Sequence, residues 1–122
     1  MQVLKTISFI SLTLVLLSGC YYDVEEEIYP TIACLTSELS YSMDIVPILQ
    51  NDCYNCHSEE ANFGNVTLEG YEEILEYVND ESLLGVIKHS SGYSPMPKGG
   101  AKLLDCEIEK IEIWINDGAI NN

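Results

Sequence analysis

Cys53-Tyr54-Asn55-Cys56-His57 is the stretch that decides how this chain folds, because it sets two thiols and an imidazole within five consecutive residues. Thiols in a Cys-x-x-Cys arrangement can each add across one vinyl group of a single haem. A histidine that directly follows the second thiol can then reach the iron from one face. The motif predicts one covalently attached haem c, held by Cys53 and Cys56, with His57 as an iron ligand.

The same pair of thiols has two other interpretations. Cys-x-x-Cys is also half of a zinc site, and it is the form of a redox dithiol. A zinc site needs two further ligands, usually a second close pair, whereas Cys34, His89 and Cys106 stand far apart in the sequence. A thioredoxin-like dithiol follows a strand in a βαβ unit, which this chain lacks. Haem attachment is therefore the leading interpretation, with zinc binding and dithiol chemistry as the alternatives.

Residues 1–19 predict a lipoprotein signal peptide. Lys5 precedes an apolar run over residues 6–17, which is too short to span a bilayer comfortably. Small residues then stand before Cys20, an ending that resembles the lipobox of bacterial lipoproteins, in which the cysteine carries the lipid. We expect an extracytoplasmic lipoprotein, anchored through Cys20 on the periplasmic side or at the outer-membrane surface. An ordinary signal peptide with a coincidental cysteine is the alternative.

The charge of the chain limits its partners. All five basic residues are lysines, and Lys5 lies in the predicted signal, so four lysines face twenty carboxylates in the mature chain, a formal charge of −16. Such a surface repels nucleic acid and anionic lipid headgroups. We expect no nucleic-acid binding, membrane attachment through the lipid on Cys20, and a redox partner protein with a basic docking face.

Two cysteines remain once Cys20, Cys53 and Cys56 have these roles. In an oxidising compartment, cysteines left over in a small domain usually pair. The sequence therefore predicts a disulfide between Cys34 and Cys106, and two unpaired thiols are the alternative.

Residues 39–122 predict one mainly α-helical haem domain, which follows an acidic tether over residues 20–38. Ser42 and Asp105 are the expected N-caps of the first and last helices, and Gly118 is the expected C′ residue of the last. Apolar residues recur every three or four positions in each segment. The expected helices are a first from Ser42 past Pro47 into the haem motif, a second over 71–78, a third over 81–89 with Leu84 and Ile87 inward, and a last with Leu104, Ile108, Ile111, Trp114 and Ile115 on its apolar side.

The loop over residues 90–101 supplies the expected second iron ligand. Met96 stands between two prolines, which restrict φ and so let a weak, soft thioether be held against iron at a small entropy loss. Met43 is interpreted as helix packing instead. His89 is the competing ligand, and its binding would lower the reduction potential relative to methionine. With neither bound, the iron could take oxygen, peroxide or another small ligand.

From about residue 40 to residue 122 the chain resembles the class I cytochrome c domain, especially the small haem lipoproteins common in Bacteroidetes-type bacteria. The resemblance is carried by Tyr41-Ser42-x-Asp44-Ile45-x-Pro47-Ile48, by Cys53, Cys56 and His57, by Ser94-Pro95-Met96-Pro97-Lys98-Gly99-Gly100, and by Ile111-x-x-Trp114-Ile115-x-x-Gly118-Ala119. It implies a fold of about four short helices around one haem, whose first and last helices cross near Trp114. The lysine ring of the mitochondrial-type pattern is missing.

The expected function follows from these features. A membrane-anchored c-type cytochrome would carry single electrons between extracytoplasmic redox partners through a haem with His57 and Met96 as ligands, and it would not be an enzyme. The alternative is a haem-based sensor or small-ligand binding module, with an open or His89-ligated sixth position. A structural lipoprotein whose cysteines only cross-link is a third hypothesis.

Overall fold

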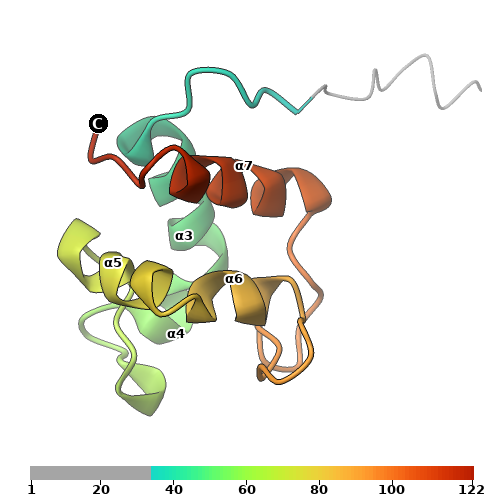
Figure 1. Ribbon diagram of the computed structural model, residues 1–122. Helices are drawn as coiled ribbons and strands as arrows, with labels where there is room; N and C mark the ends of the chain where they lie inside the picture. The colour runs from blue at the N-terminus through green and yellow to red at the C-terminus, as the bar shows by residue number, and fades with distance from the viewer. Residues whose placement is uncertain (1–33) are drawn as a thin grey trace, which may run out of the picture. The chain divides into compact units, whose positions relative to one another are not determined.

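Seven helical segments and no strand make up residues 34–122, the part of the chain that the computed structural model describes (Figure 1). The mainly α class predicted from the sequence is confirmed for this part. The predicted signal peptide, the lipidated Cys20 and most of the acidic tether lie outside the described residues. The segments are the π-helical η1 (Tyr41–Ile45), α3 (Val46–Asp52), α4 (Tyr54–His57), the 3-10 helix η2 (Phe63–Asn65), α5 (Tyr71–Asn79), α6 (Ser82–Ile87) and α7 (Asp105–Asn116).

The N-cap of the first helical segment lies two residues before the predicted cap. The hydroxyl of Ser40, not that of Ser42, accepts a hydrogen bond from the amide of Met43, at 3.1 Å. Ser40 has extended backbone geometry, which suits an N-cap residue, whereas Ser42 already lies inside the segment. The prediction of Ser42 as the cap was therefore wrong, although a helix does run from this point toward the haem motif.

A wide turn joins η1 to α3. The amides of Ile45 and Val46 donate to the carbonyls of Ser40 and Tyr41, five residues earlier in each case. Pro47 follows at the start of α3. Its ring has no N–H and would crowd the carbonyl four residues before it, so a π-type turn makes room where an α-turn would not.

The third predicted helix, over 81–89, is present but shorter than expected. It ends at Ile87, because His89 adopts a left-handed conformation with φ of 58°. The amide of Ser90 donates to the carbonyl of Gly85 at 2.9 Å, and the amide of His89 donates to that of Val86 at 3.4 Å. This pair of bonds closes a helix C-terminus in the Schellman manner.

The last helix has its predicted end but a different start. Leu104 is the N-cap, and Asp105 is the first helical residue, so the predicted cap was wrong by one position. The side chain of Glu107 accepts the amide hydrogen of Leu104 at 2.9 Å, which satisfies an amide that no backbone carbonyl of the helix can reach. At the other end, Gly118 has a φ of 98° and donates to the carbonyl of Ile115, as expected for a C′ glycine.

One apolar core joins these segments. Tyr41 of η1 stacks on Trp114 of α7 with ring centroids 5.4 Å apart, so the first and last helical segments do pack at the tryptophan. Tyr71 meets Tyr41 edge-on at 5.2 Å. Figure 1 shows α7 crossing α3, with α5 and α6 beneath it. The buried apolar residues are Tyr41, Ile45, Ile48, Leu49, Leu68, Ile74, Leu83, Ile87, Leu103, Ile108, Ile111, Trp114 and Ala119.

Three apolar residues are less buried than the sequence predicted. Leu104 is 69% exposed, because the chain is still extended there and its side chain is not part of the stripe on α7. In α6 the buried leucine is Leu83, and Leu84 is only half-buried. Met43 is 79% exposed, which overturns its interpretation as helix packing. No helix within residues 34–122 is both long enough and apolar enough to cross a membrane.

Candidate cofactor site

The motif Cys53-Tyr54-Asn55-Cys56-His57 forms a single helical turn. The amide of Cys53 donates to the carbonyl of Leu49 at 2.9 Å and completes α3. The amide of His57 donates to the carbonyl of Cys53 at 2.9 Å and closes α4. Residues three and four positions apart share one face of a helix, so Cys53, Cys56 and His57 fall on the same side. All three line one cavity.

A backbone carbonyl orients the imidazole of His57. Its Nδ1 lies 3.3 Å from the carbonyl oxygen of Val66, and an amide of the same segment, that of Leu68, donates to the carbonyl of His57 at 2.8 Å. A carbonyl can only accept, so Nδ1 carries the hydrogen and Nε2 keeps its lone pair. Metal-binding histidines use this arrangement, in which the second nitrogen fixes the tautomer and the direction of the ring.

The cavity beside this turn has a volume of about 640 Å³. Cofactor and ligand sites in proteins run from about 300 to 1,000 Å³, so its size suits a large, flat group. Phe63 of η2 and Tyr77 of α5 add aromatic surface to walls that are mostly aliphatic. The aliphatic wall residues are Val66, Leu68, Leu83, Val86, Ile87 and Leu103.

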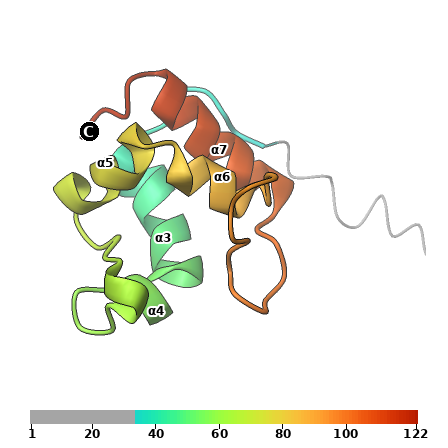
Figure 2. The ribbon, with the colours of Figure 1, turned by 60° about the horizontal axis from the view of Figure 1, so that its bottom comes forward.

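Met96 lines the same cavity, although about forty residues separate it from His57. It belongs to the loop between α6 and α7, which Figure 2 shows in orange on one side, with α4 in green on the other. Its side chain is half-buried, and its amide donates to the carbonyl of Val86 at 3.0 Å. Pro97 and Lys98 follow it along the edge of the cavity. The fold therefore brings together the two segments to which the sequence assigned iron ligands.

His89, the competing ligand, does not lie in the cavity. Its side chain is exposed, and its Nε2 is 2.9 Å from the backbone carbonyl oxygen of Met96. The imidazole is therefore directed at the backbone of the methionine loop and not at the space that the thiols and His57 border.

Cys53 lies in surroundings that disfavour its thiolate form. Burial raises the pKa of Cys53 to about 12, with smaller contributions from the charges of Asp52 and Glu107. Cys56 is exposed, and the two sulfurs are not joined in a disulfide. Thiol–disulfide exchange needs a thiolate, which a thiol with so high a pKa does not supply near neutral pH.

The side chains of this site also bear on which metal group it could hold. Within residues 34–122, no three His, Cys, Asp or Glu side chains gather closely enough to hold a metal ion on their own. A haem needs no such group, because its ring supplies four nitrogen ligands and the protein supplies only the axial ones. Two thiols, an imidazole with a free Nε2, a thioether and apolar walls are the set that a covalent haem would use.

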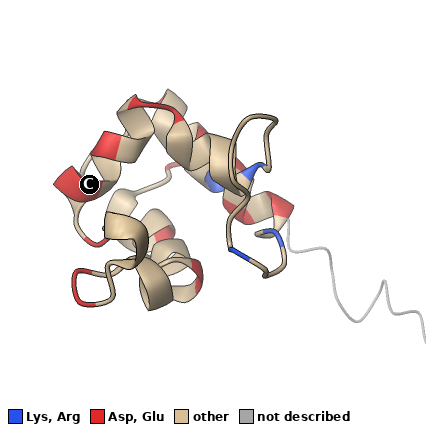
Figure 3. Cartoon of the chain, turned by 90° about the horizontal axis from the view of Figure 1, so that it is seen from below, with Lys and Arg blue, Asp and Glu red and all other residues tan. Residues whose placement is uncertain are grey.

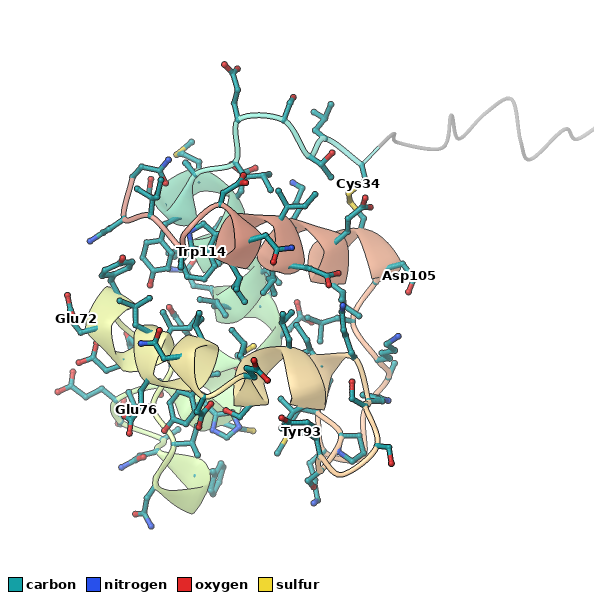
Figure 4. The ribbon with its side chains drawn as sticks, viewed as in Figure 1. Cys34, Glu72, Glu76, Tyr93, Asp105 and Trp114 are labelled. Atoms are coloured by element: carbon teal, nitrogen blue, oxygen red, sulfur yellow. A yellow bond between two sulfur atoms is a disulfide. The ribbon has the colours of Figure 1, made fainter. Side chains whose placement is uncertain are left out.

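The remaining pair of cysteines lies away from the cavity. Cys34 and Cys106 form a disulfide with their Cα atoms 5.5 Å apart, and neither residue lines the cavity. Figure 4 shows Cys34 beside the first turns of α7, near Asp105. The bond ties the start of the described region to the last helix.

Several contributors to the site carry no signal that sequence reasoning used. Val66 acts through its carbonyl, which every residue possesses, so no side-chain pattern could identify it. Phe63 is 64% exposed at the cavity edge, where its presence in a short 3-10 turn follows no periodicity. Leu83 lines the cavity, but it could have been predicted only if the buried face of α6 had been assigned correctly.

Comparison with known proteins adds no relative to this description. No protein-family model, no curated protein and no solved structure matches the chain.

Proposed function

We propose that this protein is a lipid-anchored c-type cytochrome of the class I type, which carries single electrons between extracytoplasmic redox partners. One observation carries the proposal: Cys53, Cys56, His57 and Met96, from two distant segments, border the same apolar cavity. Apolar walls alone would suit many ligands. The combination of a Cys-x-x-Cys-His turn with a facing thioether is what singles out a covalent haem.

Each of these residues has a distinct role in the proposal. A bound haem supplies a one-electron couple between ferrous and ferric iron. Cys53 and Cys56 hold it through thioether bonds, so the cofactor is retained while the surface remains accessible to partners. His57 offers Nε2 because Val66 occupies Nδ1. Met96 offers a soft sulfur ligand from the opposite segment.

The scaffold supports repeated electron transfer because both axial ligands sit on restrained backbone. His57 is held by a helical turn, and Met96 by a backbone hydrogen bond to α6. Ligands that remain in place in both oxidation states keep the reorganisation small, and apolar walls keep water from the iron. No substrate bond is made or broken, so the proposed role is that of a carrier and not of an enzyme.

The decisive experiment is optical spectroscopy of the purified mature protein, combined with two methionine variants. We expect a covalently held haem whose reduced spectrum is that of a c-type centre with two thioether bonds. In the ferric form, a weak long-wavelength sulfur-to-iron band should disappear in Met96→Ala. Met43→Ala is the matched control, because Met43 is 79% exposed and lines no part of the cavity, and it should keep the band.

Three other outcomes would contradict parts of the proposal. Absence of covalent haem would end it and favour a structural lipoprotein. A spectrum unchanged by Met96→Ala but altered by His89→Ala would assign the sixth position to His89. Rapid binding of CO by the unaltered reduced protein would favour the small-ligand sensor or binding module.

The proposed location and partner rest on the sequence and on the distribution of charge. The lipid on Cys20 would hold the protein at a membrane outside the cytoplasm, and the acidic surface would attract a basic partner. Figure 3 shows the carboxylates spread over most helices, while the lysines gather around α7 and the loop before it. Lys88 and Lys110 are paired with Glu112 and Asp44.

A further inference from the structure

His89 occupies a backbone position that normally takes glycine. It is the residue just beyond the cap of α6, and its φ of 58° lies in the left-handed region. A side chain there strains the backbone, whereas glycine adopts the same geometry freely. Gly118 is the equivalent residue of α7 and has a φ of 98°. A non-glycine residue kept in such a place points to a contact that its side chain makes.

Within residues 34–122, the side chain of His89 makes one hydrogen bond, and its partner is Met96. Nε2 lies 2.9 Å from the carbonyl oxygen of Met96, and because a carbonyl only accepts, Nε2 carries the hydrogen and donates. The amide of Met96 donates to the carbonyl of Val86 at 3.0 Å. Both polar backbone groups of the methionine are therefore bonded to the C-terminal end of α6.

A third contact fixes the part of the loop that precedes Met96. Tyr93, three residues before Met96, lies so close to Gly85 of α6 that a Cβ on the glycine would fall 2.5 Å from the tyrosine ring. The end of α6 thus supports the loop at Tyr93 by packing and at Met96 by two hydrogen bonds. Of these supports, only the bond from His89 is made by a polar side chain. A substitution at position 89 can therefore remove that bond without disturbing the packing of Tyr93 on Gly85.

We propose that His89 is a positioning residue, which holds the Met96 carbonyl and so keeps the methionine sulfur on the haem iron. The inference rests on the proposed function, because it assumes that Met96 is an iron ligand. It gives His89 a role different from that of a rival ligand, since the imidazole acts on the methionine backbone and not on the metal. Loss of this hydrogen bond would let the loop move Met96 away from the iron, so that external ligands could bind there.

The test compares His89→Gly with His89→Gln in the mature haem protein. Glycine suits the left-handed backbone better than histidine and lacks the donor, so it separates the fold from the hydrogen bond. Glutamine places an N–H donor at a similar distance from the backbone. The probe is imidazole, which displaces a methionine ligand from ferric haem, and its affinity is read from the loss of the sulfur-to-iron band.

We expect the substitutions to change the affinity for imidazole without lowering the thermal stability of the protein. His89→Gly should bind imidazole about tenfold more tightly than the unaltered protein, as expected for the loss of one backbone hydrogen bond that favours the methionine-bound state. Its thermal unfolding temperature should be no lower, because the glycine relieves strain. His89→Gln should return imidazole affinity to within about twofold of the unaltered protein.

Each contrary result has a definite meaning. Unchanged imidazole affinity in His89→Gly overturns the positioning role while leaving Met96 as a ligand. Equal affinities in the glycine and glutamine variants, both raised, overturn the donor role of the imidazole. If the unaltered protein has no sulfur-to-iron band that Met96→Ala abolishes, the methionine ligation in the proposed function fails, and the inference fails with it. The methionine variant therefore tells the two failures apart.

Discussion

The contact between His57 and Val66 shows how one hydrogen bond can fix the tautomer of the imidazole that we propose as an iron ligand. Protonated Nδ1 facing a carbonyl leaves Nε2 with a lone pair, and the bond limits rotation of the ring. An unrestrained imidazole would exchange tautomers and rotamers. Restricting it to one of them on binding would cost entropy and so reduce the binding free energy. Folding already fixes the ring, because Val66 bonds to Nδ1 and Leu68 bonds to the carbonyl of His57, so this entropy loss does not oppose ligand binding.

A second consequence at the residue scale concerns Tyr41, whose pKa burial raises to about 12, with smaller effects from Tyr54 and Glu73. The folded state disfavours the phenolate, so the stabilisation is complete below the usual tyrosine pKa near 10. It is lost as pH rises from about 10 through about 12. We expect the free energy of unfolding to fall by roughly 1–3 kcal/mol over this window, measured by denaturant titration.

Tyr41→Phe removes this dependence, because phenylalanine keeps the stacking on Trp114 and has no proton to lose. The variant should show a flatter profile of stability against pH above 10. Equal slopes for Tyr41→Phe and the unaltered protein would show that another group causes the alkaline loss.

At the scale of elements, α6 is the support on which the methionine loop rests. Leu83, Val86 and Ile87 contribute to the cavity wall, while Gly85 receives the ring of Tyr93. A short helix of Ser82–Ile87 thus joins the apolar wall to the loop that carries Met96. Its length matters, because the left-handed residue that ends it is His89, whose imidazole is directed at the Met96 carbonyl.

Gly85→Ala tests this support. Helix propensity alone predicts a gain of about 1 kcal/mol, since alanine is the better helix former. The added Cβ would lie 2.5 Å from the Tyr93 ring, and the resulting overpacking costs about 1–3 kcal/mol. We therefore expect a lower unfolding temperature and a weaker sulfur-to-iron band, measured by thermal melting and by ferric absorption.

The double variant Gly85→Ala with Tyr93→Ala is the control for this prediction. Removing the ring removes the clash, so the loss caused by the alanine at position 85 should be smaller in the Tyr93→Ala background than in the unaltered protein. Additive effects of the two substitutions would mean that the glycine and the tyrosine do not interact.

At the scale of the whole molecule, the Cys34–Cys106 disulfide closes most of the described chain into one loop, with 72 positions between its ends. A cross-link over that length stabilises by restricting the unfolded chain, by about 4 kcal/mol. The double variant Cys34→Ser with Cys106→Ser should lose about this much in denaturant unfolding. The haem spectrum should not change, because neither residue lines the cavity, and an altered spectrum would contradict that independence.

The charge of the molecule leads to a prediction about its partners. Lys98 and Lys102 form no ion pair within the described residues, and Lys98 borders the cavity together with Asp52, so two unpaired lysines stand in and beside this part of a negatively charged molecule. If the overall charge prevails, a cationic oxidant such as hexaammineruthenium should react with the reduced protein faster than ferricyanide does. Its rate should fall several-fold as salt rises from about 0.01 to 0.15 M.

The opposite salt dependence would overturn the proposal of a basic partner. A ferricyanide rate that exceeds the other and falls with salt would mean that Lys98 and Lys102 control the approach. Lys98→Glu should then slow ferricyanide markedly, whereas Lys110→Gln, at a lysine paired with Asp44, is the matched control and should change little.

Local patterns in the sequence by themselves determined the features that depend on neighbouring residues. The haem motif forms one turn because three- and four-residue spacing shares a helix face, and Gly118 ends α7 because it accepts a positive φ. The mainly helical class was also predicted from these patterns, whereas the packing of Trp114 against the first helical segment was implied by the resemblance.

Other features were decided only by the tertiary structure, because they depend on segments distant in the chain. The carbonyl of Val66 faces His57 only because residues 58–65 turn the chain back. A backbone carbonyl carries no side-chain pattern from which this contact could be predicted. His89 points to the Met96 backbone and not to the cavity, since a left-handed residue ends α6. Periodicity selected Leu84 in place of the buried Leu83 and included the exposed Leu104, because helix boundaries set the face that each residue presents, and long-range packing sets those boundaries.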